Sequence, residues 1–122
     1  MNRRVIAAVS DMIFASKIRG TAEALNVAVN FARSEDSLFD AAKTDVPSLV
    51  ILDLHATRPD PFAVAARLKA DEQLRDVPIV AFFSHVEVEL QRRALEAGVD
   101  HVLPRSAFTM RLPQILSGEA EL

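Results

Sequence analysis

The sequence predicts an α/β fold in which a parallel, doubly wound sheet of five strands lies between two layers of helices. Five short apolar segments alternate with five amphipathic ones along the 122-residue chain. Such alternation is typical of parallel sheets with right-handed crossovers. The apolar segments are nearly continuous, as in strands covered on both faces. We expect one domain over residues 1–122, with a short loose tail at 118–122.

Composition excludes several classes of function. The formal net charge is −3, so nothing favours nucleic-acid binding. The absence of cysteine excludes disulfides and thiolate metal sites. No apolar run approaches the roughly 20 residues that a transmembrane helix needs, and the N-terminus lacks the core of a signal peptide. We therefore expect a soluble, cytoplasmic protein that binds neither nucleic acid nor a membrane.

The strands are the most apolar segments of the chain. They are expected at Arg4–Val9, Val27–Ala32, Leu49–Leu54, Pro78–Phe83 and Val99–Leu103. The third is the clearest, because it begins just after Pro47 and runs through consecutive apolar residues into one carboxylate, Asp53. An ionisable group at the carboxyl end of a buried parallel strand lies where open α/β sheets bind their ligands.

Helices are expected after each strand, from apolar residues spaced three and four apart. The first follows Ser10 or Asp11 as N-cap, and the second follows Ser34. The remaining three are expected at Phe62–Lys69, at Val86–Ala97 with Gly98 as C-cap, and at Phe108–Leu116. Pro113 lies inside the last one, which predicts a kink or a late start.

Polar side chains gather where the strands end, at one edge of the predicted sheet. They are Ser10, Asp11, Asp53, His55, Ser84, His85 and Arg105. Two carboxylates can share a hard ion such as Mg²⁺, and a hydroxyl and a cation can hold phosphoryl oxygens. This edge therefore suits a phosphoryl group. The structural alternatives are a helix cap for Asp11 or Ser84 and a solvated charge for Arg105.

Four stretches carry a family resemblance. They are Val-Ile-Ala-Ala-Val-Ser-Asp, Pro-Ser-Leu-Val-Ile-Leu-Asp-Leu, Val-Pro-Ile-Val-Ala-Phe and Ala-Leu-Glu-Ala-Gly-Val-Asp-His-Val-Leu. In this order and spacing the chain resembles a response-regulator receiver domain from Arg4 to Leu116. The resemblance implies a (βα)₅ sheet of strand order 2-1-3-4-5, the CheY-like and flavodoxin-like arrangement. It also implies a signalling protein of two-component systems and no enzyme.

The resemblance also implies a site and its partners. Asp53 would accept phosphate from a histidine kinase or phosphotransfer protein, and Ser84 and Arg105 would contact the phosphoryl group. Asp11, Asp53 and the backbone carbonyl of His55 would bind Mg²⁺ weakly. The signal would pass to a downstream protein partner, and receiver domains often pair with a second copy, so a homodimer is among the expected partners.

Several positions depart from the family pattern. One acid preceded by serine, Ser10-Asp11, stands where the family has two or three adjacent acids. Counted without a gap, the hydroxyl position on the fourth strand falls on Phe83, one residue before Ser84. The aromatic position on the fifth strand falls on Val102.

The lysine–proline pair that follows the fifth strand in the family is Arg105-Ser106 here. Arginine keeps the charge, although its planar fork differs from the point charge of lysine. These departures leave two hypotheses open: a stand-alone receiver phosphorylated on Asp53, or a pseudo-receiver that binds proteins independently of phosphorylation. A small enzyme or nucleotide binder of similar shape has little support, because no glycine-rich loop follows the first strand.

Overall fold

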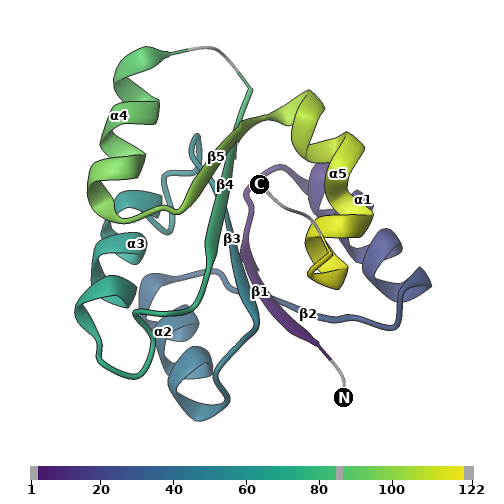
Figure 1. The fold of residues 1–122 in the computed structure, drawn as a ribbon, viewed down its shortest axis with the longest axis horizontal. Helices are drawn as coiled ribbons and strands as arrows, with labels where there is room; N and C mark the ends of the chain where they lie inside the picture. The colour runs from purple at the N-terminus through teal and green to yellow at the C-terminus, as the bar shows by residue number, and fades with distance from the viewer. Residues whose placement is uncertain (1–2, 85–86, 120–122) are drawn as a thin grey trace.

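The computed structural model describes residues 3–84 and 87–119. Its five strands are parallel and lie in the order β2-β1-β3-β4-β5, which confirms the predicted fold class (Figure 1). The strands span β1 Arg4–Ala8, β2 Ala28–Phe31, β3 Leu49–Asp53, β4 Ile79–Phe83 and β5 His101–Pro104.

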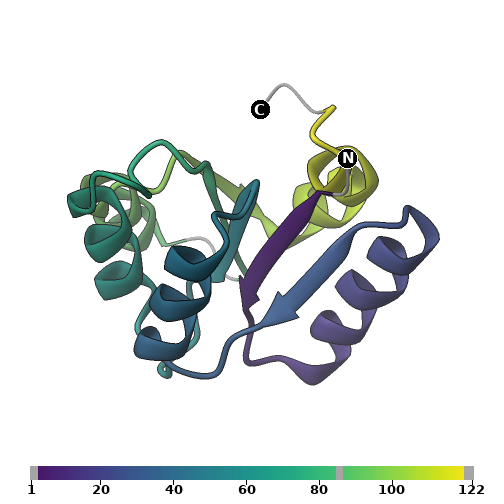
Figure 2. The same ribbon diagram turned by 90° about the horizontal axis from the view of Figure 1, so that it is seen from below.

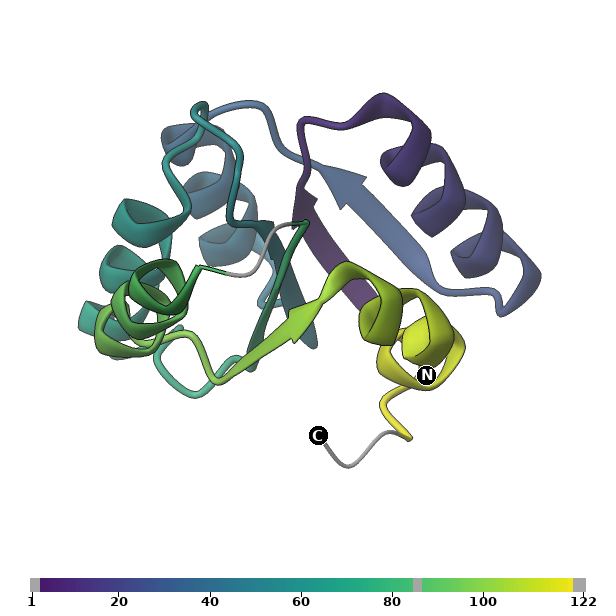
Figure 3. The same ribbon diagram turned by 90° about the horizontal axis from the view of Figure 1, so that it is seen from above.

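Two layers of helices cover the sheet. Helices α1 (Met12–Ala24) and α5 (Arg105–Ser117) lie on one face, and α2 (Glu35–Thr44), α3 (Pro61–Ala70) and α4 (Val88–Ala97) lie on the other (Figures 1 and 2). Each layer buries its own apolar cluster against the sheet. Figure 3, seen from the side opposite to Figure 2, shows the twist of the sheet between the two helix layers. The carboxyl ends of the five strands therefore lie along one edge of the sheet, between the two helix layers.

The edge strands differ from the prediction. All five residues of β3 and of β4 are buried, as expected for strands covered on both faces. Strand β2 instead alternates between exposed and half-buried residues, and β5 is half-buried. Strands β2 and β5 each have one neighbouring strand and lie at the margin of the helix layers. The helices therefore do not cover both faces of these two strands. On β2 the Phe31 ring is covered by Arg19, whose guanidinium carbon lies 4.8 Å from the ring centre.

The helix ends follow local chemistry. Asp11 is the N-cap of α1, and Ser34 is the N-cap of α2 in a reciprocal capping box with Ser37. Gly98 ends α4 at a φ of 108°, a left-handed conformation that glycine adopts at least cost. The predicted start of α4 at Val86 and the neighbouring His85 lie outside the described residues, as does most of the predicted tail.

Helix α5 corrects one prediction. It begins at Arg105, three residues before the expected start, and contains Pro113. Pro104 precedes it with φ −63° and ψ 150°, an extended conformation that suits the residue before a helix. Four buried residues, Phe108, Leu112, Ile115 and Leu116, pack on the sheet. This burial offsets the hydrogen bond that Pro113 cannot donate.

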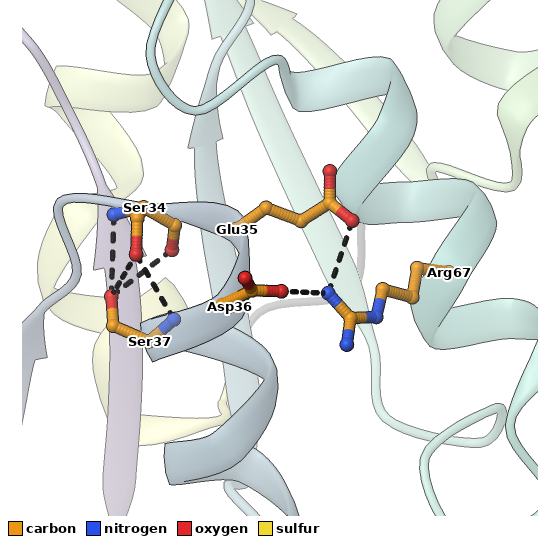
Figure 4. Close-up of polar contacts among 5 residues, drawn as sticks. All are labelled: Ser34, Glu35, Asp36, Ser37 and Arg67. Atoms are coloured by element: carbon orange, nitrogen blue, oxygen red, sulfur yellow. Dashed lines mark hydrogen bonds and ion pairs between the residues drawn. The ribbon is translucent and has the colours of Figure 1, made fainter.

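Helices α2 and α3 are joined by one arginine. Arg67 on α3 donates to Glu35 Oε2 at 3.1 Å and to Asp36 Oδ1 at 2.7 Å (Figure 4). Its guanidinium carbon lies 4.0 Å from the ring centre of Phe39. The contact fixes the start of α2 against α3.

In the part of the chain that the structure describes, no helix is both long and apolar enough to cross a bilayer.

Candidate functional site

Asp53 is the last residue of β3, in the centre of the sheet, where Phe82 of β4 is its partner. Only 4% of the residue is exposed. Its Oδ2 accepts a hydrogen bond from the Ser10 hydroxyl at 3.2 Å, and its Oδ1 accepts one from the backbone N–H of His55 at 2.9 Å. These donors supply the hydrogen bonds that a buried carboxylate requires.

Asp11 lies at the start of α1 and has different contacts. Its Oδ1 accepts from the backbone N–H groups of Ile13 at 2.9 Å and Phe14 at 3.0 Å, and its Oδ2 pairs with Arg105 Nη2 at 2.8 Å. The side chain is 37% exposed. The Phe14 N–H lowers the pKa of Asp11 from its usual value, and the Arg105 guanidinium adds to this shift. The helix-cap interpretation of Asp11 is confirmed.

Arg105 opens α5 and is held on two sides. Besides its ion pair with Asp11, its guanidinium carbon lies 4.5 Å from the ring centre of Phe14. Phe14 in turn packs against Phe82 at 4.6 Å and Phe108 at 5.6 Å between ring centres. The cation expected at a phosphoryl group is therefore bound to a carboxylate and stacked on the core of the α1/α5 layer.

Ser84 and Arg105 share a hollow beside this site. The hollow has a volume of about 710 Å³ and is lined by Phe83, Ser84, Pro104, Arg105, Ser106 and Thr109. Ser84 is exposed, whereas Phe83 is buried in the core on the α2–α4 side. The structure thus brings two of the predicted phosphoryl contacts together, but Asp53 is not among the residues that line this hollow.

Solved structures of very similar shape support an assignment of the fold. Vibrio cholerae chemotaxis response regulator CheY4 matches with a TM-score of 0.82 at 14% identity, covering 98% of this chain and 100% of that one. The phosphorylated cyanobacterial phytochrome response regulator RcpA matches with a TM-score of 0.78 at 18% identity, covering 97% and 91%. The receiver domain of the Pseudomonas aeruginosa sensor histidine kinase PA1611, with magnesium in its active-site cleft, matches at 0.79 and 17%, covering 97% and 99%.

The chain has the fold of a response-regulator receiver domain. This confirms the resemblance that the sequence motifs indicated. In sequence, no family profile matches the chain and no curated protein matches it. The likeness therefore establishes the architecture, and the chemistry of the site depends on the residues of this chain.

A magnesium site is the first chemistry to test in a receiver fold. Within residues 3–84 and 87–119, no group of three histidine or acidic side chains is placed to hold a metal ion. A cation between Asp53 and Asp11 would have to compete with the positive charge of Arg105 for Asp11. The ligand set of Asp11, Asp53 and the His55 carbonyl stays a prediction, and the contacts of Asp11 do not favour it.

Sequence reasoning missed two contacts of this receiver fold: the hydrogen bond from Ser10 to Asp53 and the ion pair of Asp11 with Arg105. Strand register carried a signal for the first. Ala8 is the partner of Leu52, so Val9 lies level with Asp53 and the next side chain, Ser10, can reach its carboxylate. No local pattern revealed the second, because its partners are 94 residues apart.

Proposed function

We propose that this chain is a receiver-fold interaction module that acts through protein–protein contacts without needing phosphorylation of Asp53. The observation that carries the proposal is the ion pair between Asp11 and Arg105, with Nη2 and Oδ2 2.8 Å apart. The ion pair joins Asp11, the second carboxylate at this edge of the sheet, to Arg105, the cation expected at a phosphoryl group. Asp53 is left with a serine hydroxyl and a backbone N–H.

The chemistry of phosphoryl transfer supports this interpretation. A carboxylate that receives a phosphoryl group needs positive charge beside it to offset the charge on the transferred oxygens. Here the charge of Arg105 is largely offset by Asp11, and the guanidinium is stacked on Phe14. Phe83 supplies no hydroxyl at the end of β4, and Ser84 comes one residue later.

Among the described residues, Phe83 and Val102 do not supply the second arrangement that a phosphoryl group would favour. Phe83 is 4% exposed and packed in the core, and Val102 on β5, the partner of Ala81, is stiff at its single torsion. A conformational response requires an element with two arrangements. A partner would therefore meet one constant surface, which suits a constitutive module.

A second function, a phosphorylatable receiver in a phosphorelay, is favoured by Asp53 itself. The carboxylate stands at the carboxyl end of the central strand, where ligands of open α/β sheets bind. Ser84 and Arg105 border one hollow near that edge. In this alternative a histidine kinase or phosphotransfer protein supplies the phosphoryl group, Mg²⁺ assists, and Arg105 leaves Asp11 to contact the phosphoryl oxygens.

Treatment with a small phosphodonor separates the two functions. The protein is incubated with acetyl phosphate and Mg²⁺, and in parallel its amide NMR spectrum is recorded with beryllofluoride and Mg²⁺. The module is expected to gain no phosphate and to show unchanged amide resonances at His55, Ser84 and Arg105. One hydroxylamine-sensitive phosphate that is absent from Asp53→Asn would overturn the proposal and establish the phosphorylatable receiver.

A further inference from the structure

The opposite edge of the sheet, where the strands begin, holds a second hollow of about 250 Å³. Its apolar wall includes Leu49, Val80 and Ile115, and its polar lining is Arg3, Ser48 and His101. It lies at the far end of the strands from Asp53, and its role is independent of the function proposed above.

Strand register explains why a hollow forms there. His101 is the partner of Val80 across β4 and β5, so both side chains lie on the same face of the sheet, which is the face covered by α1 and α5. Helix α5 ends at Ser117, and Gly118 turns the chain away at a φ of 80°. The helix therefore stops short of covering the first residues of the strands beneath it.

Arg3 is held at the rim of this hollow by one part of its guanidinium. Its Nε donates to the carbonyl of Leu116 at 2.8 Å, which satisfies an end carbonyl of α5. The guanidinium lies close to Gly118, where an added Cβ would be 2.6 Å from Nη1. The bond to Leu116 uses Nε, and no hydrogen bond joins the two terminal nitrogens to a described residue, so their donors can serve another acceptor.

We infer that this hollow binds a small carboxylate with a short apolar body. Arg3 offers the forked donors that match a carboxylate, and Ser48 and His101 add further polar contacts beside it. Leu49, Val80 and Ile115 supply the apolar wall that would cover the body of the ligand. None of the described residues that line the hollow is acidic, although the whole chain has a formal net charge of −3.

Three probes test the ligand class on the unmodified protein. Benzoate has both the charge and the apolar ring, benzyl alcohol has the ring without the charge, and inorganic phosphate has the charge without the ring. In amide NMR titrations, benzoate is expected to shift Ser48, His101 and Gly118 in a saturable manner. Benzyl alcohol and phosphate are each expected to bind at least about tenfold more weakly, a difference of about 1.4 kcal/mol.

Variants locate the site. Arg3→Leu is expected to weaken benzoate binding at least tenfold, and the matched control Arg111→Leu, at an exposed position on α5, is expected to leave it unchanged. Ser48→Ala keeps the Arg3 contact to α5 and is expected to weaken binding by a smaller factor. Absence of saturable shifts with benzoate, equal shifts with benzyl alcohol, or equal affinity of Arg3→Leu would each overturn the inference.

Discussion

Asp53 and Asp11 are two carboxylates at the same edge of one sheet, and their surroundings differ. Asp53 ends a central strand, is 4% exposed and accepts hydrogen bonds from a hydroxyl and a backbone N–H. Asp11 begins a helix, is 37% exposed at its side chain and is paired with a cation. The strand places the carboxylate of Asp53 inside the sheet. The carboxylate of Asp11 instead caps helix α1 and so contributes to the stability of that helix.

This difference shows that two carboxylates at the same edge of one sheet can have unlike contacts, because one belongs to a strand and the other to a helix end. The second acid, Asp11, accepts from the Phe14 N–H and pairs with Arg105, so it links the start of α1 to the start of α5.

The largest effect is expected in the aromatic cluster beneath Arg105. Phe14 is 3% exposed and contacts the rings of Phe82 and Phe108. Phe14→Ala leaves a cavity and removes the ring under Arg105, so it should lower the free energy of unfolding by about 3–5 kcal/mol. Urea denaturation followed by circular dichroism measures this loss.

The matched control is Phe31→Ala on the edge strand β2. Its ring also lies under an arginine, with the guanidinium carbon of Arg19 at 4.8 Å, but the residue is half-buried. It should cost clearly less than Phe14→Ala. Equal losses would mean that the edge strand is as tightly packed as the α1/α5 layer and would contradict the comparison.

The architecture could be predicted from the sequence, and the site only in part. The strand expected at Leu49–Leu54 was evident because its first four residues form an unbroken apolar run, and the structure places it at Leu49–Asp53 with every residue buried. Ser34 as N-cap and Gly98 as C-cap follow from local chemistry and were also evident. The exposure of β2 was missed, although the expected strand order 2-1-3-4-5 places it at the edge, because its apolar segment was expected to be covered on both faces like the central strands.

The contacts of Asp11 show where sequence reasoning reaches its limit. Helix cap and metal ligand are both ordinary roles for an aspartate after a strand, and the choice depends on which side chain approaches from elsewhere. That side chain is Arg105. Its approach depends on α5 beginning at Arg105, and the expected start at Phe108 left the arginine in a loop.

An intermediate effect is expected when a second carboxylate is placed beside Asp53. Ser10→Asp removes the hydroxyl donor to Oδ2 and brings a like charge to a buried carboxylate. Without metal it should lower the free energy of unfolding by about 1–3 kcal/mol. Mg²⁺ should then stabilise the variant in proportion to its occupancy and leave the unmodified protein nearly unchanged.

Thermal denaturation with and without 10 mM Mg²⁺, roughly the concentration at which a weak oxygen site is occupied, measures the difference. Ser10→Ala is the control, because it removes the same hydroxyl without adding a carboxylate. If Mg²⁺ stabilises the unmodified protein as much as Ser10→Asp, the edge already binds magnesium, and the pairing of Asp11 with Arg105 does not prevent it.

The smallest effect compares the caps of α1 and α2. Ser34 caps α2 with a neutral hydroxyl that accepts from the Ser37 N–H at 3.0 Å (Figure 4). Ser34→Ala should therefore lower the free energy of unfolding by about 1 kcal/mol. This loss should not depend on pH through the cap itself, because the hydroxyl carries no charge. Asp11 caps α1 with a charge, and its pKa is lowered in the folded protein, first by the Phe14 N–H and then by Arg105.

The sign of the Asp11 effect follows from that shift. A carboxyl whose folded pKa lies below its unfolded value of about 3.9 stabilises the fold above that pH, and the contribution is lost as pH falls through the folded pKa. Asp11→Asn keeps a good cap without the charge. The difference between the unmodified protein and Asp11→Asn, measured by urea denaturation, should thus be present at pH 7 and shrink steadily below about pH 4. A difference of the same size at pH 3 and pH 7 would show that the charge of Asp11 adds nothing to its hydrogen bonds, and the ion pair with Arg105 would then have no part in joining α1 to α5.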